Sequence, residues 1–174
     1  LVVKGVAEDF EVSNGGKVYT FKLREDAKWS NGDPVTSEDF VYSWKRILTP
    51  NFPADYAQML WVIDGAQEYN AGEQEDWGKV GVKAKDARTL EVTLKAPTPF
   101  FPELVAFYTF FPVNKKAIEA HGDDWTKPEN IVTNGAYKLG KYTPQQEVVL
   151  EKSENYWGAG DVSLERVRLR IISD

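Results

Sequence analysis

The residue types that most often carry chemistry are sparse in this chain. Its single histidine, His121, stands beside Gly122 at the end of an expected helix, where a cation interacts favourably with the helix dipole. A paired metal site or a proton relay would need a second titrating partner of this kind. Asp123 and Asp124 could bind a hard cation, but calcium loops need spaced ligands around a central glycine. We therefore expect a solvated turn there.

Nucleophiles and phosphate-binding loops are equally poorly supported. No serine has the sequence context of a nucleophile elbow; those considered are Ser30, Ser37, Ser43, Ser153 and Ser163. Asn14-Gly15-Gly16 is typical of a hairpin turn, and Gly158-Ala159-Gly160 lacks the lysine and the helix of a phosphate loop. Two carboxylates at glycosidase separation stay open as an alternative. The sequence thus predicts no catalytic residue, no metal and no cofactor.

Composition narrows the class of protein and of partner. The 174 residues carry 27 acidic and 21 basic side chains, and the resulting net charge of -6 argues against a nucleic-acid partner. Hydrophobic residues make up 42% and charged residues 28%, which is ordinary for a globular protein. No apolar run approaches the length of about 18 residues that a membrane-spanning helix needs. Cysteine is absent, so disulfides and thiol chemistry are excluded.

The clearest local signal is a strand, a turn and a capped helix in direct succession. Alternation over 17–23 predicts a strand that presents Tyr19, Phe21 and Leu23 on one face. Asn31-Gly32-Asp33-Pro34 predicts a tight turn. Thr36 is placed as the N-cap of a helix over 37–48, Asp39 as its capping-box partner, and Pro50 ends the run.

The remaining elements follow from periodicity and from glycine and proline. They are a helix over 54–71 ended by Gly72, a hairpin of 80–85 and 89–94, a short helix with Pro102 in its first turn, a helix over 115–121, and strands over 136–141, 147–152 and 167–172. Because strands and helices do not alternate in a βαβ rhythm, the class is α+β.

Four stretches resemble one known family, in the family's order. They are LREDAKWSNGDPVTSEDFVYSW over 23–44, KAPTPFF over 95–101, IVTNGAY over 131–137 and NYWG over 155–158. Together they resemble the extracellular solute-binding proteins of family 5, the peptide-binding components of ABC importers. The oligopeptide-binding branch is the most similar.

The resemblance implies a fragment of a two-lobed, periplasmic-binding-protein-like fold (type II, cluster C), with a mixed sheet and flanking helices. Residues 1–114 would be the smaller domain of the first lobe. Residues 115–174 would be a strand-rich, incomplete part of the adjoining larger domain. The alternation of Arg168-Leu169-Arg170-Ile171 predicts a half-buried strand with the arginines outward, which expects a partner and a continuation of the chain.

The resemblance also implies a function without bond chemistry. A monomer would capture oligopeptides outside the cytoplasmic membrane and deliver them to the permease subunits. It would be periplasmic, or lipid-anchored on the extracellular face in a Gram-positive envelope. Members for dipeptides, nickel chelates or oligosaccharides are the alternatives within the family, and a carboxylate-dependent glycoside hydrolase is the alternative outside it.

One residue is singled out as a ligand contact. By resemblance to the oligopeptide-binding proteins, Tyr56 reaches a bound peptide; its alternative is packing on the core. Six Trp, eight Tyr and nine Phe make 13% of the chain, and the aromatic run over 100–111 is either core or ligand wall. Aromatic platforms also bind sugars, which keeps that ligand class open. Trp29 and Trp44 are interpreted as core anchors.

Overall fold

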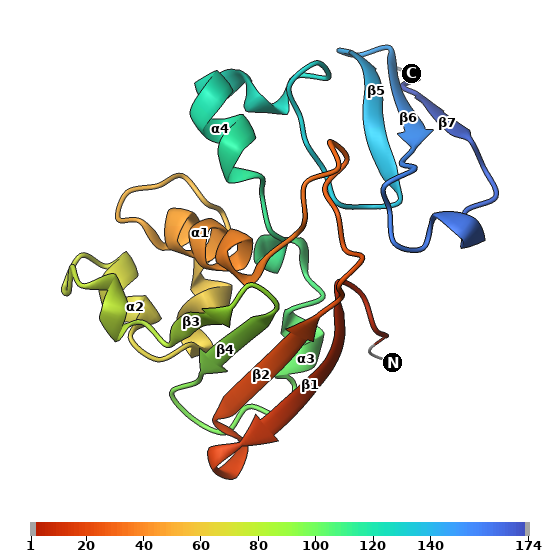
Figure 1. The fold of residues 1–174 in the computed structure, drawn as a ribbon. Coiled ribbons are helices and arrows are strands. Elements are labelled where there is room, and N and C mark those ends of the chain that lie inside the picture. The colour runs from red at the N-terminus through yellow and green to blue at the C-terminus, as the bar shows by residue number, and fades with distance from the viewer. Residues whose placement is uncertain (1–2, 173–174) are drawn as a thin grey trace. The chain divides into compact units, whose positions relative to one another are not determined.

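A computed structural model of the chain describes residues 3–172 (Figure 1). The chain divides into two compact units: unit 1 is Leu1–Glu25 with Thr36–Val113, and unit 2 is Asp26–Val35 with Asn114–Asp174. The assignment of 1–114 and 115–174 to two domains of a larger lobe stays a prediction. Among the described residues, no helix has both the length and the apolar character needed to cross a bilayer.

Unit 1 is built on a four-stranded sheet. Its strands are β1 (Ala7–Ser13), β2 (Val18–Leu23), β3 (Val82–Asp86) and β4 (Thr89–Thr93), in the order β1-β2-β4-β3. Tyr19, Phe21 and Leu23 of β2 are buried, which confirms the predicted strand and its inward face. An antiparallel sheet commonly packs one face on the core and leaves the other polar, as the alternation of β2 requires.

Helix α1 (Ser37–Leu48) packs against β3 and β4 and has the predicted limits. The Asp39 carboxylate accepts hydrogen bonds from the Thr36 N–H at 2.7 Å and from the Thr36 hydroxyl at 3.1 Å. The capping interaction between these two residues is therefore confirmed. It fixes the first turn of the helix and places the carboxylate where the helix dipole favours an anion.

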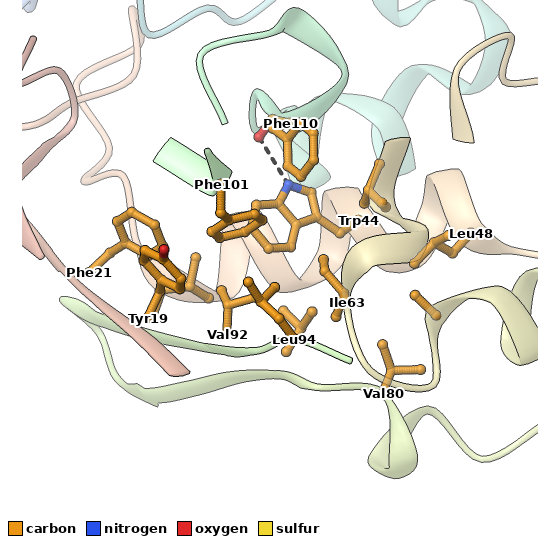
Figure 2. Packing of buried hydrophobic residues seen from close by; sticks show 14 of the residues in the cluster. Tyr19, Phe21, Trp44, Leu48, Ile63, Val80, Val92, Leu94, Phe101 and Phe110 are labelled. Atoms are coloured by element: carbon orange, nitrogen blue, oxygen red, sulfur yellow. Dashed lines mark hydrogen bonds between the residues drawn. The ribbon is translucent and has the colours of Figure 1, made fainter. Parts of the chain in front are cut away.

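The core of unit 1 lies between α1 and the sheet (Figure 2). Trp44 of α1 is almost fully buried, and its indole N–H donates to the Phe110 carbonyl at 2.9 Å, so the one polar atom of the ring is satisfied. The cluster around it comprises Tyr19, Phe21, Leu48, Leu60, Ile63, Ala66, Tyr69, Val80, Val82, Leu90, Val92, Leu94, Phe101 and Phe110. Trp29 of unit 2 is also buried, so both tryptophans are buried as predicted.

The predicted helix over 54–71 is wrong. The chain forms a 3-10 helix, η2 (Ala57–Val62), and a separate short helix, α2 (Ala66–Asn70). Between them Ile63 takes an extended conformation and bridges to Leu94, and Gly65 has a φ of 69°. A long helix would forfeit this strand-like pairing and the burial of Ile63, so tertiary contacts override the helical periodicity.

The other elements of unit 1 agree with their predictions. β3 and β4 form the antiparallel hairpin around residues 86–88. Helix α3 (Phe101–Leu104) is short and carries Pro102 in its first turn, and the 3-10 helix η4 (Tyr108–Phe110) follows it.

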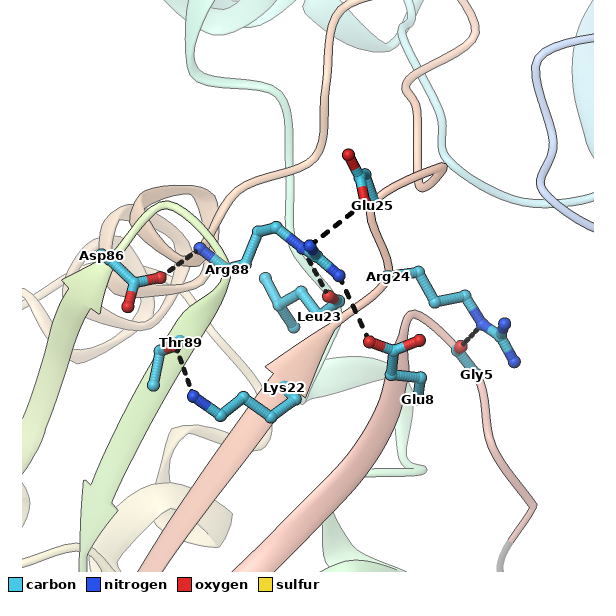
Figure 3. A network of polar contacts seen from close by, with 9 residues as sticks. All are labelled: Gly5, Glu8, Lys22, Leu23, Arg24, Glu25, Asp86, Arg88 and Thr89. Atoms are coloured by element: carbon cyan, nitrogen blue, oxygen red, sulfur yellow. Dashed lines mark hydrogen bonds and ion pairs between the residues drawn. The ribbon is translucent and has the colours of Figure 1, made fainter.

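Arg88, in the turn of that hairpin, joins three parts of unit 1 (Figure 3). Its guanidinium donates to the Leu23 carbonyl at 3.1 Å and pairs with Glu8 at 3.2 Å and Glu25 at 3.4 Å. The Arg88 backbone N–H, donating to the Asp86 carboxylate, is the main cause that lowers the pKa of Asp86. Since both ion pairs are exposed, their effect is chiefly to fix geometry at this end of the sheet.

Unit 2 contains helix α4 (Lys115–His121) and a three-stranded sheet of β5 (Tyr137–Thr143), β6 (Glu147–Lys152) and β7 (Arg166–Arg170), in the order β5-β6-β7. These limits match the predicted helix and strands to within about two residues, the usual uncertainty of element ends. The α+β class is confirmed. All five strand pairs in the described residues are antiparallel, so the mixed sheet of the family fold is not seen within this span.

The predicted turn after β2 also forms, as part of unit 2. Gly32 has a φ of 91° and its N–H donates to the Trp29 carbonyl at 2.8 Å. Ser30 exchanges hydrogen bonds with Thr133, through the Ser30 N–H at 2.6 Å and the Thr133 N–H at 3.2 Å. Asn155 adds a bond from its side-chain amide to the Ser30 carbonyl at 3.0 Å.

Gly65 and Gly72 test how closely the backbone is packed at the start and after the end of α2. Both have positive φ, so replacing either by alanine should cost about 1 kcal/mol of backbone strain. At Gly65 a Cβ would also lie 2.5 Å from the Lys79 carbonyl oxygen, whereas at Gly72 the nearest atom is a Pro50 side-chain carbon at 3.8 Å. We expect Gly65→Ala to lose about 1–3 kcal/mol more than Gly72→Ala in urea denaturation. Equal losses of stability in the two variants would contradict the close approach of Gly65 to the Lys79 carbonyl.

Candidate functional site

The candidate site is built outward from Tyr56, the one ligand contact that the sequence predicts. Tyr56 directly precedes η2, and its side chain is 43% exposed. The next residue, Ala57, is buried, as is Leu60 one turn further on. The short helix is therefore anchored in the core while the tyrosine ring stays at the surface.

Two aromatic residues from a distant part of the chain lie against this ring. Tyr56 meets Phe107 edge-to-face with ring centroids 5.5 Å apart and an interplanar angle of 81°, and Tyr108 at 5.9 Å and 87°. Phe107 and Tyr108 themselves lie 4.3 Å apart. We call Tyr56, Phe107 and Tyr108 the aromatic corner. Edge-to-face pairs of this kind are favourable beyond the area they bury, so the corner is a preformed surface.

The segment that carries Phe107 and Tyr108 is anchored by hydrogen bonds to α1. Phe110, two residues after Tyr108, is buried and accepts the indole N–H of Trp44. The Val113 N–H donates to the Ser43 hydroxyl oxygen at 2.8 Å. Both anchoring side chains belong to α1, so the helix with the strongest sequence signal supports the aromatic corner.

The surroundings of Tyr108 disfavour the ionised form of its hydroxyl. Desolvation is the main cause that raises the pKa of Tyr108, and Tyr56, its hydrogen bond and the nearby Asp55 raise it further. The Tyr108 hydroxyl thus stays protonated near pH 7 and can donate a hydrogen bond. The corner offers ring surface for apolar groups together with hydroxyls that donate or accept hydrogen bonds.

The aromatic run over 100–111 is divided between buried and exposed side chains. Phe101 and Phe110 are fully buried in the core, whereas Phe100, Tyr108 and Phe111 are more than half exposed. Phe107 and Tyr108 belong to this run, but the sequence does not connect them with Tyr56. No spacing signal could have done so, because the contact joins segments about fifty residues apart.

Several of the residues considered for catalysis lie at helix ends or form hydrogen bonds with the backbone. His121 is exposed at the end of α4, beside Gly122 as expected. Ser37 donates to the Asp86 carbonyl, and Ser43 donates to the Asp39 carbonyl at 2.6 Å while accepting from Val113. Within residues 3–172, no group of three or more His, Cys, Asp or Glu side chains could hold a metal ion.

Comparison with known proteins gives one consistent result. Residues 2–174 match the family of bacterial extracellular solute-binding proteins, family 5 Middle. The periplasmic oligopeptide-binding protein OppA of Escherichia coli is 46% identical over 165 residues, which is 94% of this chain and 30% of that protein. The dipeptide-binding protein DppE of Bacillus subtilis is 41% identical over 169 residues, 97% of this chain and 31% of that protein.

Solved structures agree with these relatives. The structure of Listeria monocytogenes OppA bound to peptide superposes with a TM-score of 0.90 at 39% identity and covers 97% of this chain and 33% of that one. The chain thus spans about a third of the length of the proteins it matches.

The pKa of Tyr108 reports on the geometry of the aromatic corner. Tyr56→Phe keeps the ring but removes the hydroxyl, so the pKa of Tyr108 should fall towards its ordinary value while remaining raised by desolvation. The titration of the Tyr108 ring carbon, followed by NMR, measures this shift. Tyr142→Phe, an exposed tyrosine of β5 in unit 2, is the control and should leave the pKa unchanged. An unaltered titration in Tyr56→Phe would contradict the contact.

Proposed function

We propose that this chain, which belongs to family 5 of the bacterial extracellular solute-binding proteins, is part of the substrate-binding component of a peptide importer. The whole protein would capture oligopeptides outside the cytoplasmic membrane and deliver them to the permease subunits of an ABC transporter. The observation that carries this proposal is the close likeness of fold and sequence to oligopeptide-binding relatives, one of them solved with a bound peptide.

Within this chain, the aromatic corner is the proposed contribution to ligand binding. Tyr56 would present its ring and hydroxyl to the peptide, and Phe107 and Tyr108 would hold the orientation of that ring. A peptide bound in extended form gains affinity mainly through its main chain, and alternate side chains are accommodated in pockets. Ring faces and hydroxyls suit this role, because they can contact both the apolar and the polar groups of a peptide.

Bond chemistry is not part of the proposal. The family and the relatives named above are binding proteins. The dipeptide-binding relative supports dipeptides as the second candidate ligand. The proposed location is the periplasm or the outer face of the cytoplasmic membrane, in line with the periplasmic relative. The whole protein would act as a monomer.

The sheet of unit 2 supports the proposal that 115–174 is part of a larger domain, with 1–114 as the smaller one. Strand register places Tyr142, Val148 and Leu169 in one row, and Leu139, Leu150 and Val167 in the next row of the same face. Leu169 is 52% exposed and Tyr142 51%, so the predicted half-burial of the last strand is not reached in the described residues. We call these six residues the apolar sheet face.

The opposite face of the same sheet carries charged side chains around a buried valine, Val149. Glu147 pairs with Lys141 at 2.8 Å and with Arg168 at 3.2 Å, and Glu151 pairs with Arg166 at 3.2 Å. The hydrogen bond from Lys141 is the main cause that lowers the pKa of Glu147. An antiparallel sheet with one charged and one apolar face normally buries the apolar one. We propose that further polypeptide of the same protein covers the apolar sheet face.

The affinity that this chain can supply alone is small. A peptide that covered the exposed parts of both tyrosine side chains would bury about 200 Å² of their surface. At roughly 25 cal/mol per Å², this burial contributes about 5 kcal/mol to binding. Association costs about 4 kcal/mol or more, whereas micromolar binding needs a net value of about 8 kcal/mol. The 174 residues by themselves should therefore bind peptide very weakly.

Calorimetry with tripeptides to pentapeptides tests the function. A longer polypeptide that spans the full length of the relatives should bind these peptides. The 174-residue chain alone should not reach micromolar affinity for them. In the extended protein, Tyr56→Ala should weaken binding about tenfold, which is typical of a tyrosine hot spot. Phe100→Ala, an exposed aromatic of unit 1 outside the aromatic corner, is the control. Micromolar affinity of the isolated chain, or unchanged binding by Tyr56→Ala, would contradict the respective proposals.

A charge placed on the apolar sheet face tests whether that face is covered. In the isolated chain Leu169→Lys should change stability by less than about 0.5 kcal/mol, because the site is exposed. In the extended protein it should cost about 2 kcal/mol or more, because an unpaired ammonium would be buried. Val12→Lys, on an exposed position of β1, should be neutral in both. A neutral Leu169→Lys in the extended protein would exclude the proposed cover.

A further inference from the structure

Three asparagines of this chain are followed directly by glycine: Asn14, Asn31 and Asn134. Such a pair can react with itself, because glycine leaves its backbone nitrogen unhindered. The nitrogen of the glycine bonds to Cγ of the asparagine, the bond from Cγ to Nδ2 breaks, and the side-chain nitrogen leaves as ammonia with the displaced proton. Water then opens the five-membered imide at either carbonyl, giving aspartate or isoaspartate. No oxidant or reductant is needed.

The surroundings of Asn14 leave this reaction free to occur. Asn14 and Gly15 lie in the loop between β1 and β2, and both are exposed. Asn14 has a φ of 50° and Gly15 a φ of 63°, and an added Cβ at Gly15 would meet nothing within 4 Å. Among residues 3–172 the Asn14 side-chain amide has no hydrogen-bond partner. The tip of a hairpin also opens readily, because few contacts hold it.

The surroundings of Asn31 oppose the same reaction, because both the attacking nitrogen and the side-chain amide are hydrogen-bonded. The Gly32 N–H, whose nitrogen would attack, donates to the Trp29 carbonyl at 2.8 Å. The Asn31 amide accepts from the Asp33 N–H at 3.1 Å and donates to the Asp33 carboxylate at 3.2 Å. Lys116 holds that carboxylate at 2.9 Å and is the main cause that lowers the pKa of Asp33, so it stays a charged acceptor.

We expect Asn134 to react more slowly than Asn14 and faster than Asn31. Its side chain is partly buried, in a segment where the neighbouring Thr133 is bonded to Ser30 and to the Tyr137 carbonyl. A partly buried amide must move before the glycine nitrogen can reach it, so its reaction in the folded chain requires a larger local opening than that of Asn14.

We propose that Asn14 is a site of spontaneous deamidation in the folded protein and that the fold protects Asn31. The product carries an additional negative charge directly after β1. Isoaspartate also inserts a methylene group into the backbone of a turn that must bring Ser13 opposite Val18. The modified hairpin therefore loses part of the register between β1 and β2.

Peptide mapping by mass spectrometry tests this proposal. The chain is incubated at mildly alkaline pH, folded in one sample and unfolded in urea in the other, and the conversion at each asparagine is followed with time. In urea the three sites should react at similar rates. In the folded chain Asn14 should keep most of its unfolded rate, whereas Asn31 should be slowed by about tenfold or more, since it reacts only after local opening.

A variant provides the matched control. Asn14→Gly removes the reacting amide and tolerates the positive φ of this position. It should abolish the fastest-forming acidic species in ion-exchange chromatography of the folded chain. Acidic species forming at an unchanged rate in Asn14→Gly would overturn the proposal, as would a folded wild-type chain in which Asn31 reacts as fast as Asn14.

Discussion

The burial of Trp44 is the interaction on which most of unit 1 depends. Its ring fills the space between α1 and the sheet, and its indole N–H is satisfied by the Phe110 carbonyl. A buried donor without that acceptor would be costly, so the segment around Phe110 cannot move without loss. The same segment carries Phe107 and Tyr108. The orientation of Tyr56 at the surface thus follows from a hydrogen bond deep in the core.

The two units expose apolar surface of different kinds, and the difference supports different roles. The aromatic corner consists of rings in which Tyr56 meets Phe107 and Tyr108 edge-to-face, and its two tyrosines combine ring surface with a hydroxyl. The apolar sheet face is largely aliphatic, spread over three strands and backed by ion pairs. Aromatic rings with a polar hydroxyl suit the reversible binding of a ligand. A wide aliphatic sheet face is typical of a surface that packs against another layer.

Local signals in the sequence predicted local structure well. The limits of α1 follow from Thr36, Asp39 and Pro50, because capping and proline act within one turn of the chain. The helix over 54–71 failed because the bridge between Ile63 and Leu94 links residues thirty positions apart. The same limit applies to the site. Resemblance could single out Tyr56, but its ring partners come from beyond residue 100, and only the fold brings them together.

The segment over 26–35 makes the two units interdependent. The chain leaves unit 1 after Glu25, returns at Thr36 and leaves again after Val113. Within unit 2 the segment is held by Thr133 and Asn155 through Ser30, and by Lys116 through Asp33. If unit 2 unfolded, the residues directly before the N-cap of α1 would lose these partners. The first turn of the helix that carries Trp44 would then be freer to fray. A division at residue 114 would therefore separate the segment 26–35 from the rest of unit 2.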